Sequence, residues 1–535
     1  MNTIFSYPTS TIQRSFSSIF STLFALRSMM QQTFDFVIIG SGLGGLQCGH
    51  ILSDMGFKVC VLEKNQQLGG SLQVFAREKT VFDTGVHYIG DLDPGQSLYR
   101  YFKYFGLMDS VKWKRLDSAG FDRISMEGDP TNYLHNQGWD AFVAGLSAQF
   151  PSEAKAIATY REVMEKIAAN FPLDSLEYNE KDHLDDELLS ISAAEFIAQL
   201  TTNTTLQLVL AGSSLLHAAS AEKCPLFVHA LTTNGYMHGA YRCVDGGSQI
   251  AKQLARNIHA MGGEIHRRAA VTGFKSDEHK ITSVVCADGR EFAATHFISN
   301  VHPKNTFDLL PPELKKGPYF KRIAALPNGL SSFNVHIVCK PNSFPYLNYN
   351  QYHHRSSNAF AQADYAEDQW PLNIMLSTPA SSRSETYAEG ITLMTYMRSS
   401  ETDSWANTHN TIVNPNKRGE DYEAFKVRKA EQMIAAIEEK FPDIRQSIQS
   451  YYCTTPLTFR DYIGNDDGSM YGFEKDYRSP MLTFIPPRTK VPNLYLTGQN
   501  INLHGMSGVT ISSIVTCSYF VDREELLQRI KKFSE

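Results

Sequence analysis

The chain has few of the features that would assign it at once to a specialised class. Its eight cysteines are scattered along 535 residues without C-x-x-C spacing. This pattern argues against zinc, an iron–sulfur cluster or a disulfide framework, and it favours an intracellular reducing compartment. A net charge of −6 leaves no basic footprint for nucleic acid. No apolar run approaches the ~20 residues that cross a bilayer, so a transmembrane protein is not expected.

Catalytic motifs that work through protein side chains are missing as well. The sequence has no H-E-x-x-H, P-loop or Ser-His-Asp signature. With 42% hydrophobic and 20% charged residues, it is nevertheless an ordinary globular chain, long enough for two or three domains. A bound cofactor would therefore have to carry any redox or group-transfer chemistry.

The first 32 residues contain no acidic residue. They carry Arg14 and Arg27, are rich in Ser and Thr, and place apolar residues at helical spacing, as a transit peptide does. The competing interpretation is that Met29 or Met30 is the true start and that residues 1–32 extend the gene prediction. The first interpretation places the protein in an organelle, and the second in the cytoplasm or on a membrane surface.

A buried strand followed by a glycine turn is the most informative local pattern. Residues 36–39 are continuously apolar, as in a parallel strand covered on both faces. Gly40, Gly42 and Gly45 follow in G-x-G-x-x-G spacing, which permits a tight turn, the approach of a pyrophosphate to the backbone and close helix packing. A helix from about residue 44 to 55 would then direct its N-terminal amides at phosphates.

The unit closes with a second strand over residues 58–62 and an acid at its end. Glu63 stands where a carboxylate accepts hydrogen bonds from ribose hydroxyls and disfavours a 2′-phosphate. A glycine triplet alone is weak support, but strand, helix, second strand and acid arrive here at the right distances. The segment therefore predicts a Rossmann-type site for NAD or FAD.

Further motifs resemble the family of FAD-dependent phytoene desaturases, carotenoid isomerases and retinol saturases. They are Leu68-Gly69-Gly70-Ser71, Phe82-Asp83-Thr84-Gly85-Val86-His87-Tyr88-Ile89-Gly90, Val244-Asp245-Gly246-Gly247-Ser248, Ile298-Ser299-Asn300, Leu309-Leu310-Pro311, Thr455-Pro456-Leu457-Thr458, Gly468-Ser469-Met470-Tyr471-Gly472, Asn493-Leu494-Tyr495-Leu496-Thr497-Gly498-Gln499-Asn500 and Gly505-Met506-Ser507-Gly508-Val509. The resemblance covers about residues 33 to 525. Through D-T-G-x-H-Y-I-G and L-T-G-Q it is strongest to the retinol saturase branch.

The resemblance implies an α/β fold with a Rossmann-type FAD-binding domain, of the amine-oxidase and glutathione-reductase kind, and a substrate domain of mixed sheet and helices. FAD uses the single dinucleotide signature, so a nicotinamide donor, NAD(P)H, would visit the flavin only transiently. In the resembling fold, the strand at Val271 passes the adenine. The residues that the resemblance assigns to FAD are Gly40, Gly42, Leu43, Gly44, Gly45, Glu63, Lys64, Gly70, Ser71, Val271, Gly498, Gln499, Gly508 and Val509.

The closing motif also has a physical interpretation. Residues 494–496 form an apolar strand that ends near Gly498, and a helix begins near Gly505. A backbone-rich turn followed by a helix N-terminus can stabilise negative charge on a reduced flavin. Many relatives carry an acid after this glycine to hold the ribityl chain. Gln499 and Asn500 stand there instead, so a neutral amide is expected to take that role.

The FAD-binding domain is predicted to be discontinuous. Its segments are residues 33–95, 241–310 and 480–535, and the inserts 96–240 and 311–479 together are expected to form the substrate domain. The second segment should contain a hairpin about Asp288-Gly289, and the second insert a long helix over residues 421–440.

Reduction of an isolated C=C bond needs hydride at one carbon and a proton at the other, the latter from an acid or water. Candidate proton donors beside the family motifs are His87, Tyr88, Tyr471 and His504. For each of them the competing interpretation is a structural residue. A tyrosine in a G-x-x-Y-G loop, for example, is usually a half-buried packing residue with a bonded hydroxyl.

Several functions stay open at this point. The resemblance favours an FAD-dependent reductase that saturates an apolar conjugated isoprenoid, such as a retinoid or carotenoid. A desaturase or a polyene cis–trans isomerase would use the same fold and flavin, and an amine oxidase is a further alternative. The Rab escort and GDP-dissociation-inhibitor proteins share the fold but bind prenylated partners without catalysis, and the intact glycine turn and Glu63 argue against them.

A basic and aromatic segment raises the question of membrane contact. Residues 311–322 combine cations with Tyr319 and Phe320. Such a segment can touch an anionic membrane surface. A solvated helix end is the favoured alternative, because charge runs are usually exposed to water. The oligomeric state is not predicted.

Overall fold

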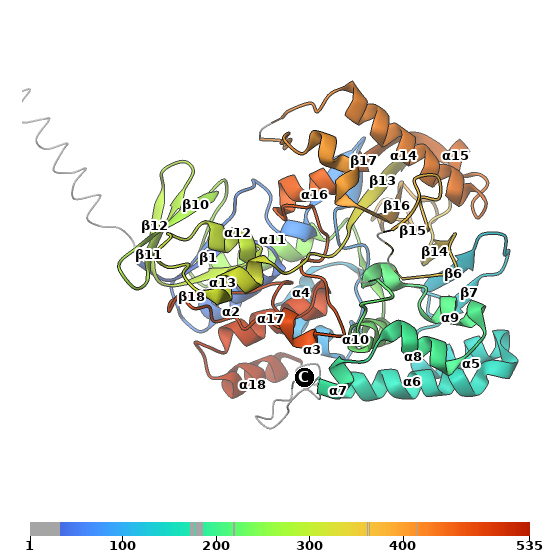
Figure 1. Ribbon diagram of the computed structural model, residues 1–535, viewed down its shortest axis with the longest axis horizontal. Coiled ribbons are helices and arrows are strands. Elements are labelled where there is room, and N and C mark those ends of the chain that lie inside the picture. Colours follow the sequence, from blue (N-terminus) through green and yellow to red (C-terminus); the bar gives the residue numbers. More distant parts are fainter. Residues whose placement is uncertain are drawn as a thin grey trace, which may run out of the picture.

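A computed structural model describes residues 33–171, 176, 186–217, 220–360, 362, 364–413 and 415–534. It contains two seven-stranded sheets, with helices packed around both (Figure 1). The expectations for residues 1–32 lie outside the described part of the chain.

The first sheet is built around β1 (Thr33–Ile39), whose last four residues are all buried. Its parallel strands are, in order, β18 (Leu494–Leu496), β12 (Glu291–Ser299), β1, β2 (Val59–Leu62) and β9 (Glu264–His266). An antiparallel hairpin, β10 (Val271–Ser276) and β11 (Ile281–Cys286), extends the sheet from β12. The turn between β11 and β12 contains Asp288 and Gly289, which confirms the predicted hairpin.

Register brings the ends of four strands to one edge of this sheet. Ile39 at the end of β1 lies opposite Leu62 of β2 and Ser299 of β12. Ser299 in turn lies opposite Leu496 of β18. Because parallel strands share one direction, the glycine turn after β1, the acid after β2 and the motifs after β12 and β18 must meet.

Both faces of the sheet are covered, which explains why residues 36–39 of β1 are all apolar and buried. Phe36 and Ile38 pack into a core with three helices, whereas Val37 and Ile39 pack into another core with the β10–β11 hairpin. The three helices are α2 (Leu43–Asp54), α11 (Ser248–Ala260) and α17 (Gly505–Cys517). Since α2 contacts both of the other helices, its N-terminus is held firmly against the strand ends.

The second sheet draws on both long inserts. Its order is β17 (Ile448–Thr454), β13 (Ser331–Cys339), β16 (Gly390–Met397), β15 (Asn373–Ser377), β14 (Asn350–His354), β6 (Asp122–Met126) and β7 (Tyr133–His135). The parallel pairing of β6 with β14 joins the two inserts in one sheet. The predicted long helix is α14 (Glu420–Glu438), and its apolar residues pack against this sheet. The exact domain boundaries stay a prediction.

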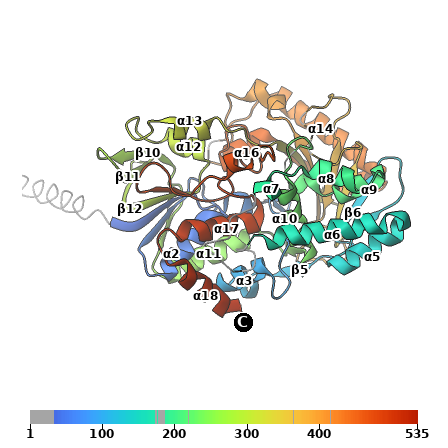
Figure 2. The same cartoon turned by 60° about the horizontal axis from the view of Figure 1, so that its bottom comes forward.

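Helices of the first insert pack beside the second sheet, as Figure 2 shows. They are α5 (Trp139–Gln149), α6 (Ala154–Ala169), α8 (Ala193–Leu200), α9 (Thr204–Leu210) and α10 (Leu226–Met237), and their apolar faces share one core with Tyr352, Met375 and Met394 of that sheet. The apolar residues of α3 (Ser97–Tyr104) instead pack into the core of the first sheet, next to α17 and α18 (Arg523–Ser534).

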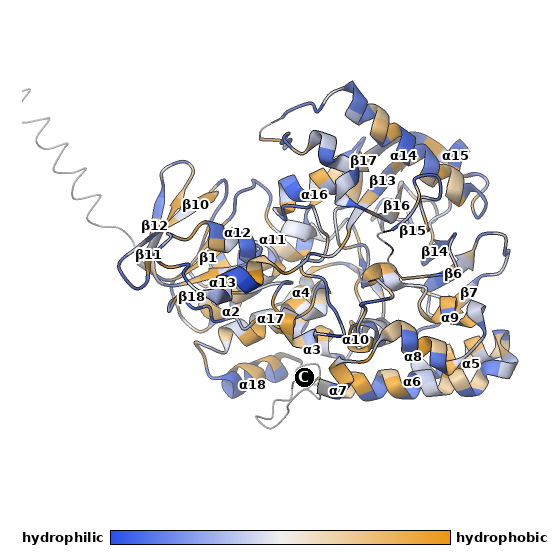
Figure 3. Ribbon diagram, in the orientation of Figure 1, coloured by the Kyte–Doolittle hydropathy of each residue, from blue (hydrophilic) through white to orange (hydrophobic). Residues whose placement is uncertain are grey.

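The basic segment that the sequence analysis singled out is α13 (Pro318–Ala324) with the residues before it. Lys321 and Arg322 are exposed, whereas Phe320 is buried against Phe307. In Figure 3 the outer side of α13 is correspondingly hydrophilic. Among the helices that the structure describes, none has the length and apolarity needed to cross a membrane.

Candidate active site

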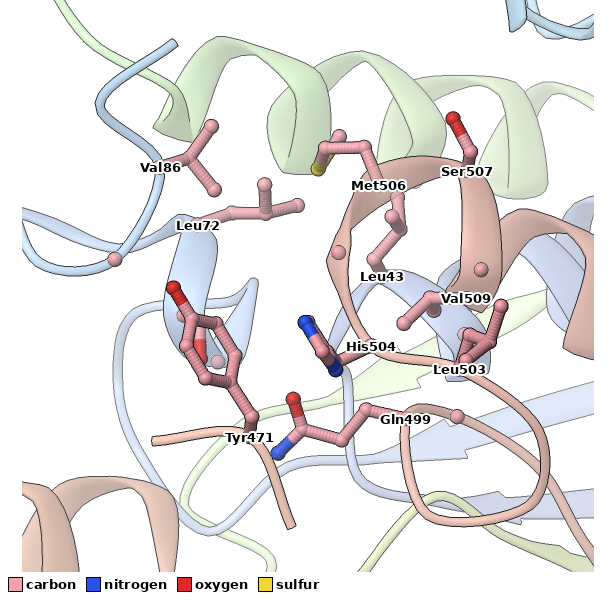
Figure 4. Close-up of a pocket in the computed structure, with 18 of the residues that line it drawn as sticks. Leu43, Leu72, Val86, Tyr471, Gln499, Leu503, His504, Met506, Ser507 and Val509 are labelled. Atoms are coloured by element: carbon pink, nitrogen blue, oxygen red, sulfur yellow. The ribbon is translucent and has the colours of Figure 1, made fainter. Parts of the chain in front are cut away.

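A large cavity lies between the two sheets, at the carboxyl ends of the parallel strands. Its volume is about 1360 Å³. Because a pocket for one drug-sized ligand is typically ~300–1,000 Å³, this cavity has room for a cofactor and a substrate together. Its lining changes along its length, from backbone and polar groups at the strand ends to mostly apolar side chains beyond them. Figure 4 shows some of the lining residues, among them Tyr471, Gln499 and His504.

Glu63 organises the end of the cavity next to the glycine turn. Its Oε2 accepts hydrogen bonds from the Ser41 amide (3.0 Å) and the Ser41 hydroxyl (2.6 Å), and its Oε1 accepts one from the Asn65 amide (2.8 Å). The carboxylate is buried but lines the cavity, so lone pairs stay available for ribose hydroxyls. Lys64 beside it is exposed along part of its side chain, its ammonium donates to the Asp461 carbonyl (3.2 Å), and desolvation there lowers the pKa of that ammonium.

The N-terminus of α2 opens directly on the cavity. Gly42 is its N-cap and offers no side chain, and no acidic residue stands in the first turn. The first amides of the helix therefore have no side-chain cap and suit an anion. Gly45 lies behind the turn, where a Cβ would sit 2.0 Å from the Gly40 carbonyl oxygen.

A second uncapped helix, α17, points its N-terminus at the same cavity. Gly498 precedes it in a left-handed turn with φ of 93°, and a Cβ on Gly44 would lie 3.1 Å from the Gly498 Cα. Hydrogen bonds tie the helix to α2, from Gln47 to the Thr510 hydroxyl (2.8 Å) and from Ser513 to the Gly44 carbonyl (3.3 Å). Two positive helix ends are thus fixed side by side.

The residues predicted to hold FAD converge as the resemblance implies. Gly40, Gly42, Leu43, Gly44, Glu63, Lys64, Gly70, Ser71, Val271, Gly498, Gln499, Gly508 and Val509 all line the cavity. Gly45 does not line it and acts through packing. This lining fits the adenine, ribose and pyrophosphate of FAD. It offers an acid for ribose hydroxyls, two uncapped helix N-termini for phosphates, and glycines that let the cofactor approach the backbone.

Two neutral amides, Gln499 and Asn500, follow Gly498 at the place where the resemblance implies an acid. The Gln499 amide donates to the Met470 carbonyl (3.3 Å), and Asn500 accepts from the Phe473 amide (3.2 Å). Both residues therefore fasten the Gly468–Gly472 loop to the turn. Both residues line the cavity, but Gln499 is half-buried and Asn500 is buried, so the Gln499 side chain is the more accessible of the two to a ribityl chain.

The hydroxyl of Tyr88 is engaged in two buried hydrogen bonds, which favours a structural role over that of a proton donor. It donates to Asp122 Oδ2 (2.9 Å) and lies 2.7 Å from the Tyr352 hydroxyl. Burial raises the pKa of Asp122 to about 7 and raises that of Tyr88 as well. This buried network connects the D-T-G-x-H-Y-I-G motif to the second sheet, which is a structural role.

The two histidines are poor acids at neutral pH. Burial lowers the pKa of His87 to about 4 and that of His504 to about 4, so both rings are uncharged. His504 Nε2 donates to the Leu216 carbonyl at 2.8 Å, which leaves Nδ1 as an acceptor. Its ring packs on Tyr471, with ring centroids 4.3 Å apart.

Tyr471 is the candidate that the geometry favours. Its hydroxyl points into the cavity toward Leu72 and Val86 (Figure 4). Within the described part of the chain this hydroxyl has no hydrogen-bond partner, contrary to the bonded hydroxyl expected of a packing tyrosine. Burial raises the Tyr471 pKa to about 12, so the hydroxyl keeps its proton at neutral pH.

Some lining residues were not assigned by the sequence analysis. Asn300 follows β12, and its side chain fills the space beside three glycines, Gly42, Gly44 and Gly498. Because Asn300 follows a strand that is parallel to β1, the sequence could have predicted its place at the ligand-binding edge of the sheet. Met375 and Met394, from neighbouring strands of the second sheet, face the cavity as well, but they carry no motif.

Fold and site together define a flavin-binding oxidoreductase with a deep apolar substrate cavity. Sequence comparison agrees, because residues 43–518 match the family of flavin-containing amine oxidoreductases. The chain belongs to that family, which implies FAD as the cofactor.

Relatives with named activities are similar over nearly the whole chain. All-trans-retinol 13,14-reductase of Homo sapiens is 27% identical, across 94% of this chain and 88% of that protein. The chloroplastic prolycopene isomerase of Daucus carota is 24% identical, across 87% of this chain and 76% of that protein. Among solved structures, an oxidoreductase from Methanosarcina mazei has the same fold, with a TM-score of 0.59, 17% identity, and coverage of 90% of this chain and 98% of that one.

Proposed function

We propose that the protein is an FAD-dependent reductase that saturates a C=C bond of an apolar conjugated isoprenoid, in the manner of an all-trans-retinol 13,14-reductase. The observation that carries the proposal is the Tyr471 hydroxyl, which faces an apolar space beside two helix N-termini without a protein partner in the described residues. Likeness to the retinol reductases supports the substrate class.

The residues of this chain have separable roles in the proposed reaction. Bound FAD would supply hydride to one carbon of the double bond. Tyr471 holds a proton at its hydroxyl oxygen for the other carbon, and its pKa of about 12 keeps that proton in place until carbanion character develops. His504, packed on the Tyr471 ring, orients the phenol.

The apolar walls perform the remaining task, which is to bind a long hydrocarbon and exclude water. Met375, Met394, Leu231 and Val228 line the cavity beyond the flavin motifs. Burial of such a chain contributes about 25 cal/mol per Å² of apolar area removed from water.

NAD(P)H is the proposed electron donor. Because the sequence carries one dinucleotide-binding signature, which FAD uses, NAD(P)H would reach the flavin only transiently. Residues 33–95, 241–310 and 480–535 are proposed as the FAD-binding domain.

An anaerobic experiment tests the proposal. The flavin is reduced with dithionite, all-trans-retinol or a carotenoid is added, and reoxidation is followed together with product mass. A gain of two hydrogens is expected. An unchanged mass with altered geometry would assign a polyene isomerase, as in the prolycopene isomerase relative, and flavin reduction by substrate alone would assign a desaturase. A protein that binds no FAD would favour the non-catalytic prenyl-binding alternative.

A further inference from the structure

The cavity continues past the flavin motifs along one side of α17. Ile511 and Val515, one helical turn apart, line this extension. From Ser507 to Val515 the helix rises by roughly 12 Å, at ~1.5 Å per residue. The opposite walls are Ala168, Ala169 and Phe171 at the end of α6, and the first turn of α3. Figures 1 and 2 both place α3 beside α17.

Arg100 places a positive charge in this extension. Arg100, on α3, is half-buried and lines the cavity. Among the described residues, no ion pair or hydrogen bond is formed by its guanidinium. Lys103 on the same helix differs, because it pairs with Asp109 at 2.9 Å.

The acidic residues that also line the extension are already engaged. Asp91 accepts hydrogen bonds from the Ser97 hydroxyl and the Leu98 amide, the latter at 2.9 Å, and so caps α3. Glu165 accepts from Arg161 Nε at 2.9 Å. Arg523, at the start of α18 (Arg523–Ser534), also lines the cavity but is engaged in an interaction of its own. The extension therefore offers positive charge at the end of an apolar channel.

We propose that Arg100 binds the anionic end, a carboxylate, of an elongated apolar substrate whose conjugated part reaches the flavin. This inference rests on the proposed function and narrows its substrate class to an isoprenoid acid. A guanidinium presents two parallel N–H groups to a carboxylate, and apolar walls strengthen a charge interaction relative to water. An alcohol of the same length would leave Arg100 without a counter-ion.

Equilibrium dialysis of the oxidised flavoprotein tests the proposal without turnover. The probes are all-trans-retinoic acid and all-trans-retinol, and the proteins are wild type, Arg100→Gln and Lys103→Gln. Wild type should bind the acid more tightly than the alcohol. Arg100→Gln should weaken binding of the acid about tenfold or more and leave the alcohol nearly unchanged. Lys103→Gln, which loses the same charge from the same helix, should behave as wild type toward both probes.

Several outcomes would overturn the assignment. Equal binding of acid and alcohol by wild type would do so, as would loss of both in Arg100→Gln when its flavin content is normal. The phosphates of NADPH are another source of negative charge. If Arg100→Gln weakened NADPH binding and spared the acid, the site would belong to the electron donor. Should Arg100→Gln fail to fold, Arg100→Lys must bind the acid more weakly than wild type and the alcohol equally.

Turnover separates this inference from the proposed function. If the acid depends on Arg100 for binding but neither probe gains two hydrogens from the reduced flavoprotein, the reductase proposal fails and the subsite stands. If both probes are reduced and neither depends on Arg100, the reductase proposal stands and the subsite fails.

Discussion

The two ends of the cavity are built from different kinds of atoms. At the nucleotide end, backbone amides, glycine turns and helix N-termini face the ligand, and Glu63 is fixed by three hydrogen bonds. At the substrate end, side chains from remote segments form the wall, among them Tyr471, Met375 and Arg100.

This difference shows how one fold can keep its cofactor while its substrates change. A backbone-built site tolerates no added Cβ, as the close approaches of Gly44 and Gly45 show. A wall of side chains can change one residue at a time without disturbing the sheet edge. Substitutions at the two ends should therefore give distinct defects, loss of cofactor at one and loss of turnover or selectivity at the other.

The largest effect is expected from Gly42→Val, which should abolish flavin retention. A Cβ there would lie 2.6 Å from Asn300 Nδ2, and the side chain would fill the space for the pyrophosphate. The measurement is the amount of flavin released per protein on denaturation. Gly273→Val is the control, because its Cβ would meet nothing within 4 Å. We expect the double variant Gly42→Val/Asn300→Ala to lack flavin as well, because the valine would still fill the space for the pyrophosphate. Recovery of flavin in that variant would show instead that only the clash with Asn300 mattered.

Tyr471→Phe should leave flavin content intact and slow substrate-dependent reoxidation by about 100-fold or more, the usual contribution of a general acid. Single-turnover stopped-flow measurement of the reduced enzyme gives this rate. Tyr236→Phe is the matched control, because Tyr236 also lines the cavity but its hydroxyl donates to the Tyr88 carbonyl at 3.4 Å. Equal rates for Tyr471→Phe and wild type would assign the proton to water.

Burial of His504 should make the folded protein less stable at acid pH. Burial lowers its pKa from 6.5 to about 4, so the unfolded chain binds one more proton between these pH values. Stability must therefore fall as pH drops from about 6.5 to 4, by up to about 3 kcal/mol for this group. His504→Gln should show a shallower pH dependence of the unfolding free energy, measured by urea titration. The control is His279→Gln, at an exposed position, which should show the same dependence of the unfolding free energy on pH as wild type. The same pH dependence in wild type, His504→Gln and His279→Gln would refute the prediction.

The smallest effect is expected from Glu63→Gln, with about tenfold weaker FAD binding. An amide cannot accept from both Ser41 and Asn65, so one donor loses its partner at a cost of about 1.5 kcal/mol. Titration of the apoprotein with FAD gives the dissociation constant. Asp277→Asn, in an exposed turn, serves as the control. Unchanged affinity in Glu63→Gln would remove the carboxylate from the ribose site.

The proton-donor candidates show what sequence reasoning can and cannot reach. His87, Tyr88, Tyr471 and His504, which the motifs single out, all line the cavity, and the assignment of one of them as the proton donor stays a prediction. The motifs could not rank the four. Tyr88 is engaged by Tyr352, 264 residues away, and that pairing leaves no local trace in the sequence.

By itself, the sequence determined the glycine turn, the acid after the second strand and the hairpin at Asp288-Gly289, because each depends on neighbours within a few residues. Only the tertiary structure decided that the Tyr471 hydroxyl faces open space, that Asn300 fills the gap among the glycines, and that Arg100 has no acid partner in the described residues. Those properties depend on which side chains from distant segments meet at one point. The packing of the whole molecule decides which of them do.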